Sequence, residues 1–163
     1  YTTLFRSISF SCLSRFGLVA VLSLPITSWA QPTSPTIDNT HEVNQRLDFL
    51  YGQHQPYQKF LKDFQAATYE HHKNQVVAMI NYPIKINLHG KKVTFKSRQD
   101  LLKRYDEIFD PMLVKTIQEQ KYENLFANTR GVMIGESGEI WFSGFCVDKD
   151  CKKVDIKVIA INK

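Results

Sequence analysis

The chain has 163 residues, of which 21 are basic and 16 acidic, and its formal net charge is +5 at pH 7. Without residues 1–30, which contain two arginines and no acidic residue, the net charge is +3, from 19 basic and 16 acidic residues. This charge is too mild and too evenly spread to predict a nucleic-acid surface. The remaining 133 residues fit one globular domain that buries about two thirds of its unfolded surface.

Residues 1–30 are predicted to be a signal peptide that is cleaved after Ala30. Arg6 and Arg15 supply the positive charge, and an apolar stretch follows from residue 16 to residue 26. Ser28 and Ala30 are the small residues that a signal peptidase requires. The stretch is shorter than the about 20 residues needed to span a bilayer as a helix. We therefore expect a periplasmic protein without stable membrane insertion; an uncleaved N-terminal anchor is the alternative.

A flexible leader is predicted for residues 31–44, which are rich in Pro, Ser, Thr and Asn. Residues 45–163 are then expected to form the single domain. Its first clear helix begins near Pro56, which suits a first helical position. Apolar side chains follow at helical spacing: Tyr57, Phe60, Leu61, Phe64 and Ala67. A shorter helix over 72–80 ends before Pro83.

The pattern then changes to a period of two, which predicts a β-hairpin over residues 84–95 with its turn at Gly90. Ser97 and Asp100 resemble a helix capping box, so a helix is expected from there to Phe109. The pair Asp110-Pro111 starts a further short helix.

The remaining segments are predicted to be strands over 131–134, 139–147 and 154–161. In the last strand, alternation places Val154, Ile156, Val158 and Ala160 on one face. Helices that precede an antiparallel meander favour an α+β fold, with helices packed on one face of a curved antiparallel sheet.

This order of elements resembles the NTF2-like superfamily, in which a cone of helices packs on a bent sheet. The resemblance rests on residues 76–83, the helix over 97–109, and the runs 131–135 and 139–142. It covers about residues 55 to 162 and is nearest to small periplasmic members of unknown role. It implies an NTF2-like or cystatin-like cone, and it says little about function.

Cys146 and Cys151 are the cysteines that remain after export, and we expect them to form a disulfide. Closing so short a loop is expected to stabilise the fold by roughly 2 kcal/mol. A redox-active or metal-binding pair is the alternative. The spacing disfavours it, since four residues separate the thiols and no His or further Cys lies nearby.

The resemblance implies a pocket between the sheet and the helices, which in enzymes of the superfamily holds an acid–base residue. Candidate pocket residues are aromatic: Tyr69, Tyr82, Tyr105 and Trp141. Aromatic side chains on apolar faces are more often core residues. Adjacent His71 and His72 diverge on a helix, so no metal site is expected. The sequence contains no phosphate loop and no dinucleotide-binding fingerprint, so no cofactor is expected either.

The sequence therefore favours a non-catalytic binding protein over an enzyme, although it leaves the question open. An inhibitor or immunity-type protein acting on a protein partner is the specific hypothesis. Its partner-binding loop would be Asp148-Lys149-Asp150, with the Glu136-Ser137-Gly138 turn as a second exposed candidate. The alternatives are a small-ligand-binding protein, a pocket enzyme of isomerase or dehydratase type, and an accessory subunit of an envelope assembly.

Overall fold

The computed structural model describes residues 38–163. The predicted signal peptide, its cleavage site and residues 31–37 of the predicted leader lie outside the described residues. Within residues 38–163, no helix combines the length and apolar character that crossing a bilayer requires.

Three helices open the described chain: α1 (Thr40–Tyr51), α2 (Gln55–Tyr69) and α3 (Lys73–Ala78). Pro56 lies in the first turn of α2, as predicted. The leader predicted to extend to residue 44 is wrong in its last part, because α1 begins at Thr40. Val43 and Leu47 are four residues apart on α1 and both are buried, so distant packing stabilises a helix whose sequence is mostly polar.

Capping side chains begin two of the next helices. Ser97 accepts a hydrogen bond from the Asp100 amide (3.2 Å) at the start of α4 (Arg98–Leu102). Asp110 accepts one from the Leu113 amide (2.9 Å) at the start of α6 (Pro111–Glu119). The continuous helix predicted from Ser97 to Phe109 is wrong. Arg104 leaves helical geometry (φ −126°), so a separate α5 (Tyr105–Ile108) follows, and a short 3₁₀ helix, η1 (Tyr122–Asn124), comes after α6.

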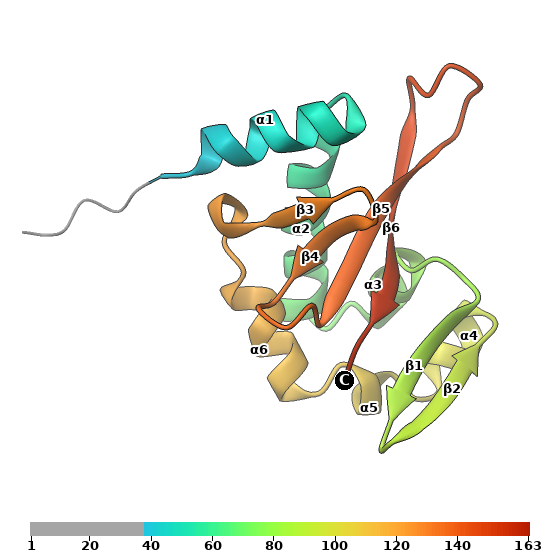
Figure 1. Ribbon diagram of the computed structural model, residues 1–163. Coiled ribbons are helices and arrows are strands. Elements are labelled where there is room, and N and C mark those ends of the chain that lie inside the picture. The colour runs from blue at the N-terminus through green and yellow to red at the C-terminus, as the bar shows by residue number, and fades with distance from the viewer. Residues whose placement is uncertain (1–37) are drawn as a thin grey trace, which may run out of the picture. The chain divides into compact units, whose positions relative to one another are not determined.

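Six strands form one sheet in the order β2-β1-β6-β5-β4-β3 (Figure 1). Their bounds are β1 Ile84–Leu88, β2 Lys91–Phe95, β3 Phe126–Asn128, β4 Gly131–Ile134, β5 Ile140–Cys146 and β6 Val154–Ile161. The predicted α+β class is confirmed. The sheet is mixed rather than antiparallel, because β1 pairs in parallel with β6 where Ile86 lies opposite Ile161. Strand β3 was not predicted, because three residues are too few to show the two-residue alternation of a strand.

A β-bulge changes which side chains of β6 face the core. Trp141 pairs with Ala160 and Phe142 pairs with Val158, so Ile159 is an extra residue between them. The alternation predicted for β6 therefore fails at its end. Ile161 is buried, whereas Ala160 is only half-buried.

The core lies between the sheet and the helices, and α2 supplies its largest side chains. Phe60 of α2 stacks on Phe142 of β5 with ring centroids 4.8 Å apart, and it also stacks on Phe64 (5.7 Å). Phe64 in turn meets the edge of Phe109, which follows α5 (6.3 Å). This aromatic stack fixes the register of α2 against β5, whose far end forms the site described next.

Candidate functional site

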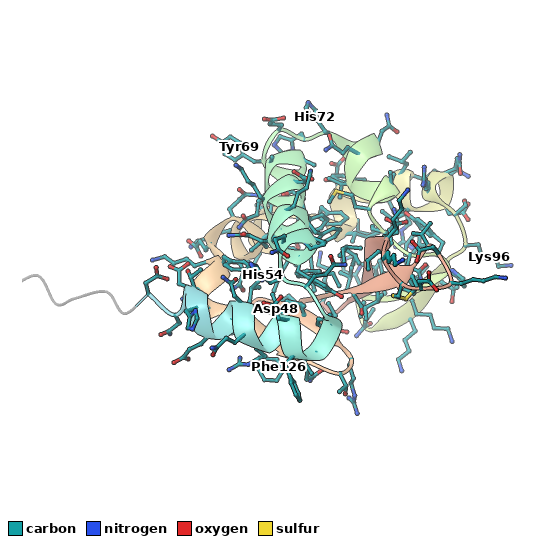
Figure 2. All side chains as sticks on the ribbon, turned by 90° about the horizontal axis from the view of Figure 1, so that it is seen from above. Asp48, His54, Tyr69, His72, Lys96 and Phe126 are labelled. Atoms are coloured by element: carbon teal, nitrogen blue, oxygen red, sulfur yellow. A yellow bond between two sulfur atoms is a disulfide. The ribbon has the colours of Figure 1, made fainter. Side chains whose placement is uncertain are left out.

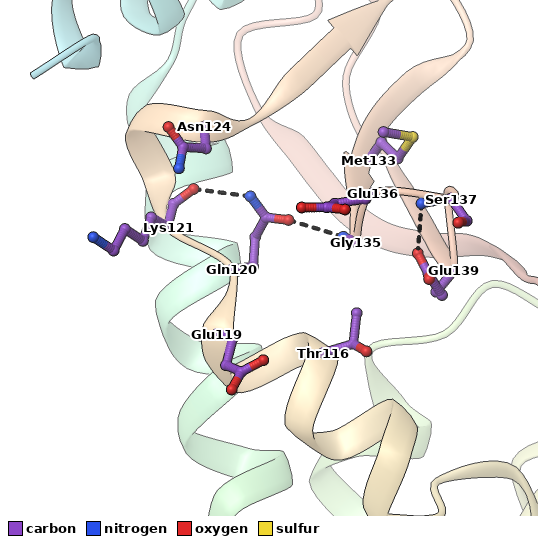
Figure 3. Close-up of a pocket in the computed structure, with 10 residues that line it drawn as sticks. All are labelled: Thr116, Glu119, Gln120, Lys121, Asn124, Met133, Gly135, Glu136, Ser137 and Glu139. Atoms are coloured by element: carbon purple, nitrogen blue, oxygen red, sulfur yellow. Dashed lines mark hydrogen bonds between the residues drawn. The ribbon is translucent and has the colours of Figure 1, made fainter. Parts of the chain in front are cut away.

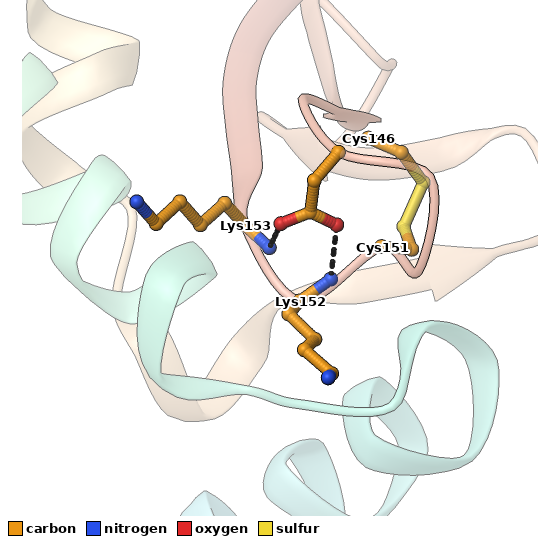
Figure 4. The surroundings of a disulfide bond; sticks show 5 residues. Cys146, Cys151, Lys152 and Lys153 are labelled. Atoms are coloured by element: carbon orange, nitrogen blue, oxygen red, sulfur yellow. Dashed lines mark hydrogen bonds between the residues drawn. A yellow bond between two sulfur atoms is a disulfide. The ribbon is translucent and has the colours of Figure 1, made fainter.

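The β5–β6 hairpin ends in a loop that a disulfide closes. We call residues 145–153 the stapled tip. Cys146 and Cys151 are bonded, as predicted, with Cα atoms 4.7 Å apart (Figure 4). Cys151 has a left-handed backbone (φ 55°), which is unfavourable for a residue with a side chain. The cross-link and the hydrogen bonds around it hold the chain in that conformation.

The Asp148 carboxylate organises the tip from inside. Its two oxygens accept hydrogen bonds from the Lys152 amide (2.8 Å) and the Lys153 amide (2.9 Å), as Figure 4 shows. Its backbone carbonyl also accepts one from the Cys151 amide (3.2 Å). Each oxygen of the Asp148 carboxylate therefore already accepts one backbone hydrogen bond within the tip.

The side chains that the tip presents to solvent are partly apolar. Phe145 is 42% exposed and Val147 is 66% exposed, and both lie in the strand predicted over residues 139–147. Lys152 lies 3.6 Å from Asp150. Among the described residues, Lys149 and Lys153 have no acidic side chain within salt-bridge distance. The tip thus presents an apolar pair flanked by free positive charge.

Within residues 38–163, no third strand pairs with the end of the hairpin that carries the tip. Strand β4 pairs with β5 no further than Phe142, and β1 meets β6 at its other end, at Ile161. The last four residues of β5 therefore pair with β6 alone, and Figure 1 shows the hairpin extending past its neighbouring strands. The Glu136-Ser137-Gly138 turn precedes β5, so it lies at the opposite end of that strand. The two exposed candidates from the sequence therefore lie at opposite ends of β5 and do not form one surface.

Comparison of the chain with protein-family models, with curated proteins and with solved structures finds no match. The site must be interpreted from its own geometry.

The four aromatic residues predicted to line a pocket do not meet in one. Tyr69 is 71% exposed at the end of α2 (Figure 2). Tyr82 donates a hydrogen bond to the Val77 carbonyl (3.0 Å), and Tyr105 is fully buried. Burial raises the pKa of both these phenols to about 12, so both stay protonated at neutral pH. Trp141 lies on the outer face of the sheet, edge-on to Phe126 (6.3 Å).

A separate cleft of about 500 Å³ lies between α6 and the turn that joins β4 to β5 (Figure 3). The Gln120 side chain links its walls, donating to the Lys121 carbonyl (2.9 Å) and accepting from the Gly135 amide (2.8 Å). Glu139 accepts from the Ser137 amide (3.1 Å). A second cleft, of about 400 Å³, lies beside Leu113 and shares Thr116, Ser137 and Glu139 with the first. The Glu136-Ser137-Gly138 turn was a candidate from the sequence, but no local pattern indicates that α6 faces it.

Within residues 38–163, no three His, Cys, Asp or Glu side chains gather closely enough to hold a metal ion. His72 lies 3.2 Å from Glu70, and both side chains are more than half exposed. His71 has a left-handed backbone (φ 54°) in the turn between α2 and α3. Both histidines therefore lie in the connection that precedes α3, and not on a helix as the sequence had suggested.

Proposed function

We propose that this protein is a non-catalytic, exported binding protein of the inhibitor or immunity type, and that its stapled tip inserts into a cleft of a protein partner. One observation carries the proposal. The tip is covalently closed and internally hydrogen-bonded, and it still presents Phe145 and Val147 to solvent.

Preorganisation is the physical reason to assign binding to this loop. Ordering a flexible loop at an interface opposes association, and a loop that is already ordered avoids much of that entropy loss. A few well-packed, desolvated side chains near the centre of an interface supply most of the binding free energy. The aromatic Phe145 is suited to be such an anchor, with Val147 adding apolar contact area beside it, and Lys149 and Lys153 would favour an acidic rim on the partner.

We further propose that the fold is an NTF2-like cone and that the protein acts in the periplasm. The mixed six-stranded sheet with α2 across its buried face is compatible with such a cone. The aromatic stack of Phe60, Phe64 and Phe142 fills space that a pocket enzyme would keep open, which favours binding by the surface. The proposed location rests on the predicted signal peptide and on the disulfide.

The test is affinity capture from a periplasmic extract of the source organism, followed by calorimetry with the captured protein. Phe145→Ser/Val147→Ser changes the apolar pair of the tip. Phe49→Ser/Tyr69→Ser is the matched control, since those side chains are 90% and 71% exposed on α1 and α2. We expect the tip variant to lose at least roughly tenfold in affinity, as for truncated interface anchors, and the control to bind normally. Equal affinity of both variants would show that the tip is not the binding surface.

A small-ligand-binding protein is the second candidate, and the cleft beside α6 favours it. A volume of about 500 Å³ is within the range of sites for small molecules. The same two variants separate the candidates. A metabolite that raises the melting temperature of both variants as much as that of the unchanged protein would bind away from the tip, and loss of that shift in Gln120→Ala would assign binding to the cleft.

A further inference from the structure

The β1–β2 hairpin and the four residues after it carry an unusual charge. The sequence from Ile84 to Gln99 contains five basic side chains and no acidic one: Lys85, Lys91, Lys92, Lys96 and Arg98. The rest of residues 38–163 carries 14 basic and 16 acidic side chains. The even spread of charge expected from the whole chain therefore fails locally. The fold places this excess positive charge on the β1–β2 hairpin and on the residues just after it, where Arg98 begins α4.

All five basic side chains of the hairpin segment are exposed, and among the described residues none has a carboxylate within salt-bridge distance. Other lysines do have one. Lys73 lies 2.7 Å from Asp106, and Lys157 lies 3.3 Å from Asp155. Glu107 reaches the turn of the hairpin, where its Oε1 lies 3.2 Å from Nδ1 of His89. Its carboxylate also accepts a hydrogen bond from Nε of Arg104 (2.7 Å), so it pairs with Arg104 and not with a lysine of the hairpin.

Strand pairing separates the charged face of the hairpin from its buried face. Lys85 lies opposite Thr94, and Asn87 lies opposite Lys92, all four exposed. Ile86 and Leu88 on the other face are buried. Figure 2 shows Lys96, which follows β2, extending away from the ribbon. Lys85 and Lys92 share the exposed face of a ribbon whose strands are only about 17 Å long, so both can contact one planar anionic surface at the same time.

Protection of a free sheet edge explains only part of this pattern. Lysines on an edge strand discourage pairing with another chain, and β2 is an edge strand. That explanation covers Lys91 and Lys92. It does not cover Lys85, which lies on the inner strand β1, or Lys96 and Arg98, which follow the strand.

We propose that the β1–β2 hairpin is an electrostatic docking surface for an anionic phospholipid bilayer. The charged face belongs to a two-stranded ribbon, which can lie along a planar array of headgroup phosphates. Binding to single-stranded nucleic acid is less well supported, because the aromatic residue of this segment, Phe95, is buried and cannot stack on a base.

The position of this surface leaves the stapled tip free. Strand β1 meets β6 at Ile161, and the tip begins beyond Val154, at the other end of the same strand. A strand of eight residues is about 26 Å long. A molecule docked on a bilayer by the hairpin would therefore present its tip to a partner away from the attachment point. Docking does not require that the tip bind anything, so the two proposals can fail separately.

The test is co-sedimentation of the full chain with phosphatidylcholine vesicles, with and without about one third phosphatidylglycerol, at low salt and at high salt. Lys85→Gln/Lys92→Gln/Lys96→Gln changes the hairpin. Lys149→Gln/Lys152→Gln/Lys153→Gln removes the same charge from the tip and is the control. Thermal melting verifies that both variants fold. Any binding through the apolar stretch of residues 16–26 is common to all forms, and the vesicles without phosphatidylglycerol measure it.

We expect the unchanged protein and the tip variant to bind anionic vesicles at low salt and to dissociate at high salt. The hairpin variant should bind roughly a hundredfold more weakly, since each lysine near an anionic surface contributes about fivefold. Equal weakening of both variants, binding that ignores salt and phosphatidylglycerol, or absence of binding overturns the proposal. So does binding of an acidic polypeptide or of DNA through the hairpin without binding to vesicles.

Discussion

The hydroxyl of Tyr57 on α2 occupies the space that a side chain would need at Gly144 in the middle of β5. A Cβ placed on Gly144 would lie 2.7 Å from that oxygen and 2.4 Å from Cγ1 of Val154. The backbone of Gly144 is not left-handed, so close approach rather than backbone conformation requires glycine here. This contact joins α2 to the hairpin that carries the stapled tip.

Gly144→Ala is therefore expected to destabilise the protein by about 1–3 kcal/mol through overpacking. Adding Tyr57→Phe removes the oxygen and should recover part of that loss. Urea unfolding of the single and double variants measures both effects. Gly90→Ala is the comparison without overpacking. Gly90 has a left-handed backbone (φ 76°) and no atom lies within 4 Å of the added Cβ, so this variant measures only the free-energy cost of placing alanine in that backbone conformation. If the double variant is no more stable than Gly144→Ala, the Tyr57 contact is not the cause.

Asp148 is predicted to control the order of the tip rather than the stability of the core. Asp148→Ala leaves the Lys152 and Lys153 amides without their acceptor, and it should cost only about 1 kcal/mol because solvent can reach the loop. Hydrogen exchange at these two amides should accelerate strongly. The neighbouring Asp150→Ala is the control, since Asp150 contacts only the Lys152 side chain among the described residues. Unchanged exchange in Asp148→Ala would contradict this role.

Phe142 and Trp141 are adjacent on β5, and their substitution should have unequal effects. Phe142 is fully buried against Phe60, so Phe142→Ala is expected to cost about 3–5 kcal/mol. Trp141 is half-buried on the outer face, so Trp141→Ala should cost clearly less, although sequence analysis treated Trp141 as a core or pocket residue. Urea unfolding ranks the two variants. A larger loss for Trp141→Ala would mean that the outer face is covered in solution.

Asp110 makes the start of α6 sensitive to acid. The Leu113 amide and then the Lys163 ammonium hold the pKa of the Asp110 carboxyl below its ordinary value of 3.8. A carboxyl with a lowered pKa stabilises the fold above its unfolded-state pKa, and this contribution is lost as pH falls through the folded-state pKa. Asp110→Ala should cost about 1 kcal/mol at neutral pH, as for loss of a helix N-cap.

The pH dependence distinguishes this contribution from simple packing. We expect the difference in unfolding free energy between the unchanged protein and Asp110→Ala to shrink below pH 3.8. Asp110→Asn keeps a capping oxygen that does not titrate, so it should be more stable than Asp110→Ala both at neutral pH and below pH 3.8. A difference that stays constant with pH would exclude a role for the ionised carboxylate.

Local chemistry in the sequence determined several features of this protein by itself. Ser97 and Asp110 each cap a helix through an amide three residues away, so a few neighbouring residues contain the whole signal. The bounds of β4 and β6 and the disulfide between Cys146 and Cys151 were likewise predicted. In each case the interacting groups are close in the chain, or the alternation of the strand is regular.

Only the tertiary structure decided which elements meet. Helix α1 is mostly polar, and β3 has three residues, so both depend on partners far along the chain. The parallel contact of Ile86 with Ile161 makes the sheet mixed, and the bulge at Ile159 shifts the buried face of β6. The same pairings place the basic hairpin and the stapled tip at opposite ends of β6. Such pairings depend on the combined packing of distant segments, and no local pattern encodes them.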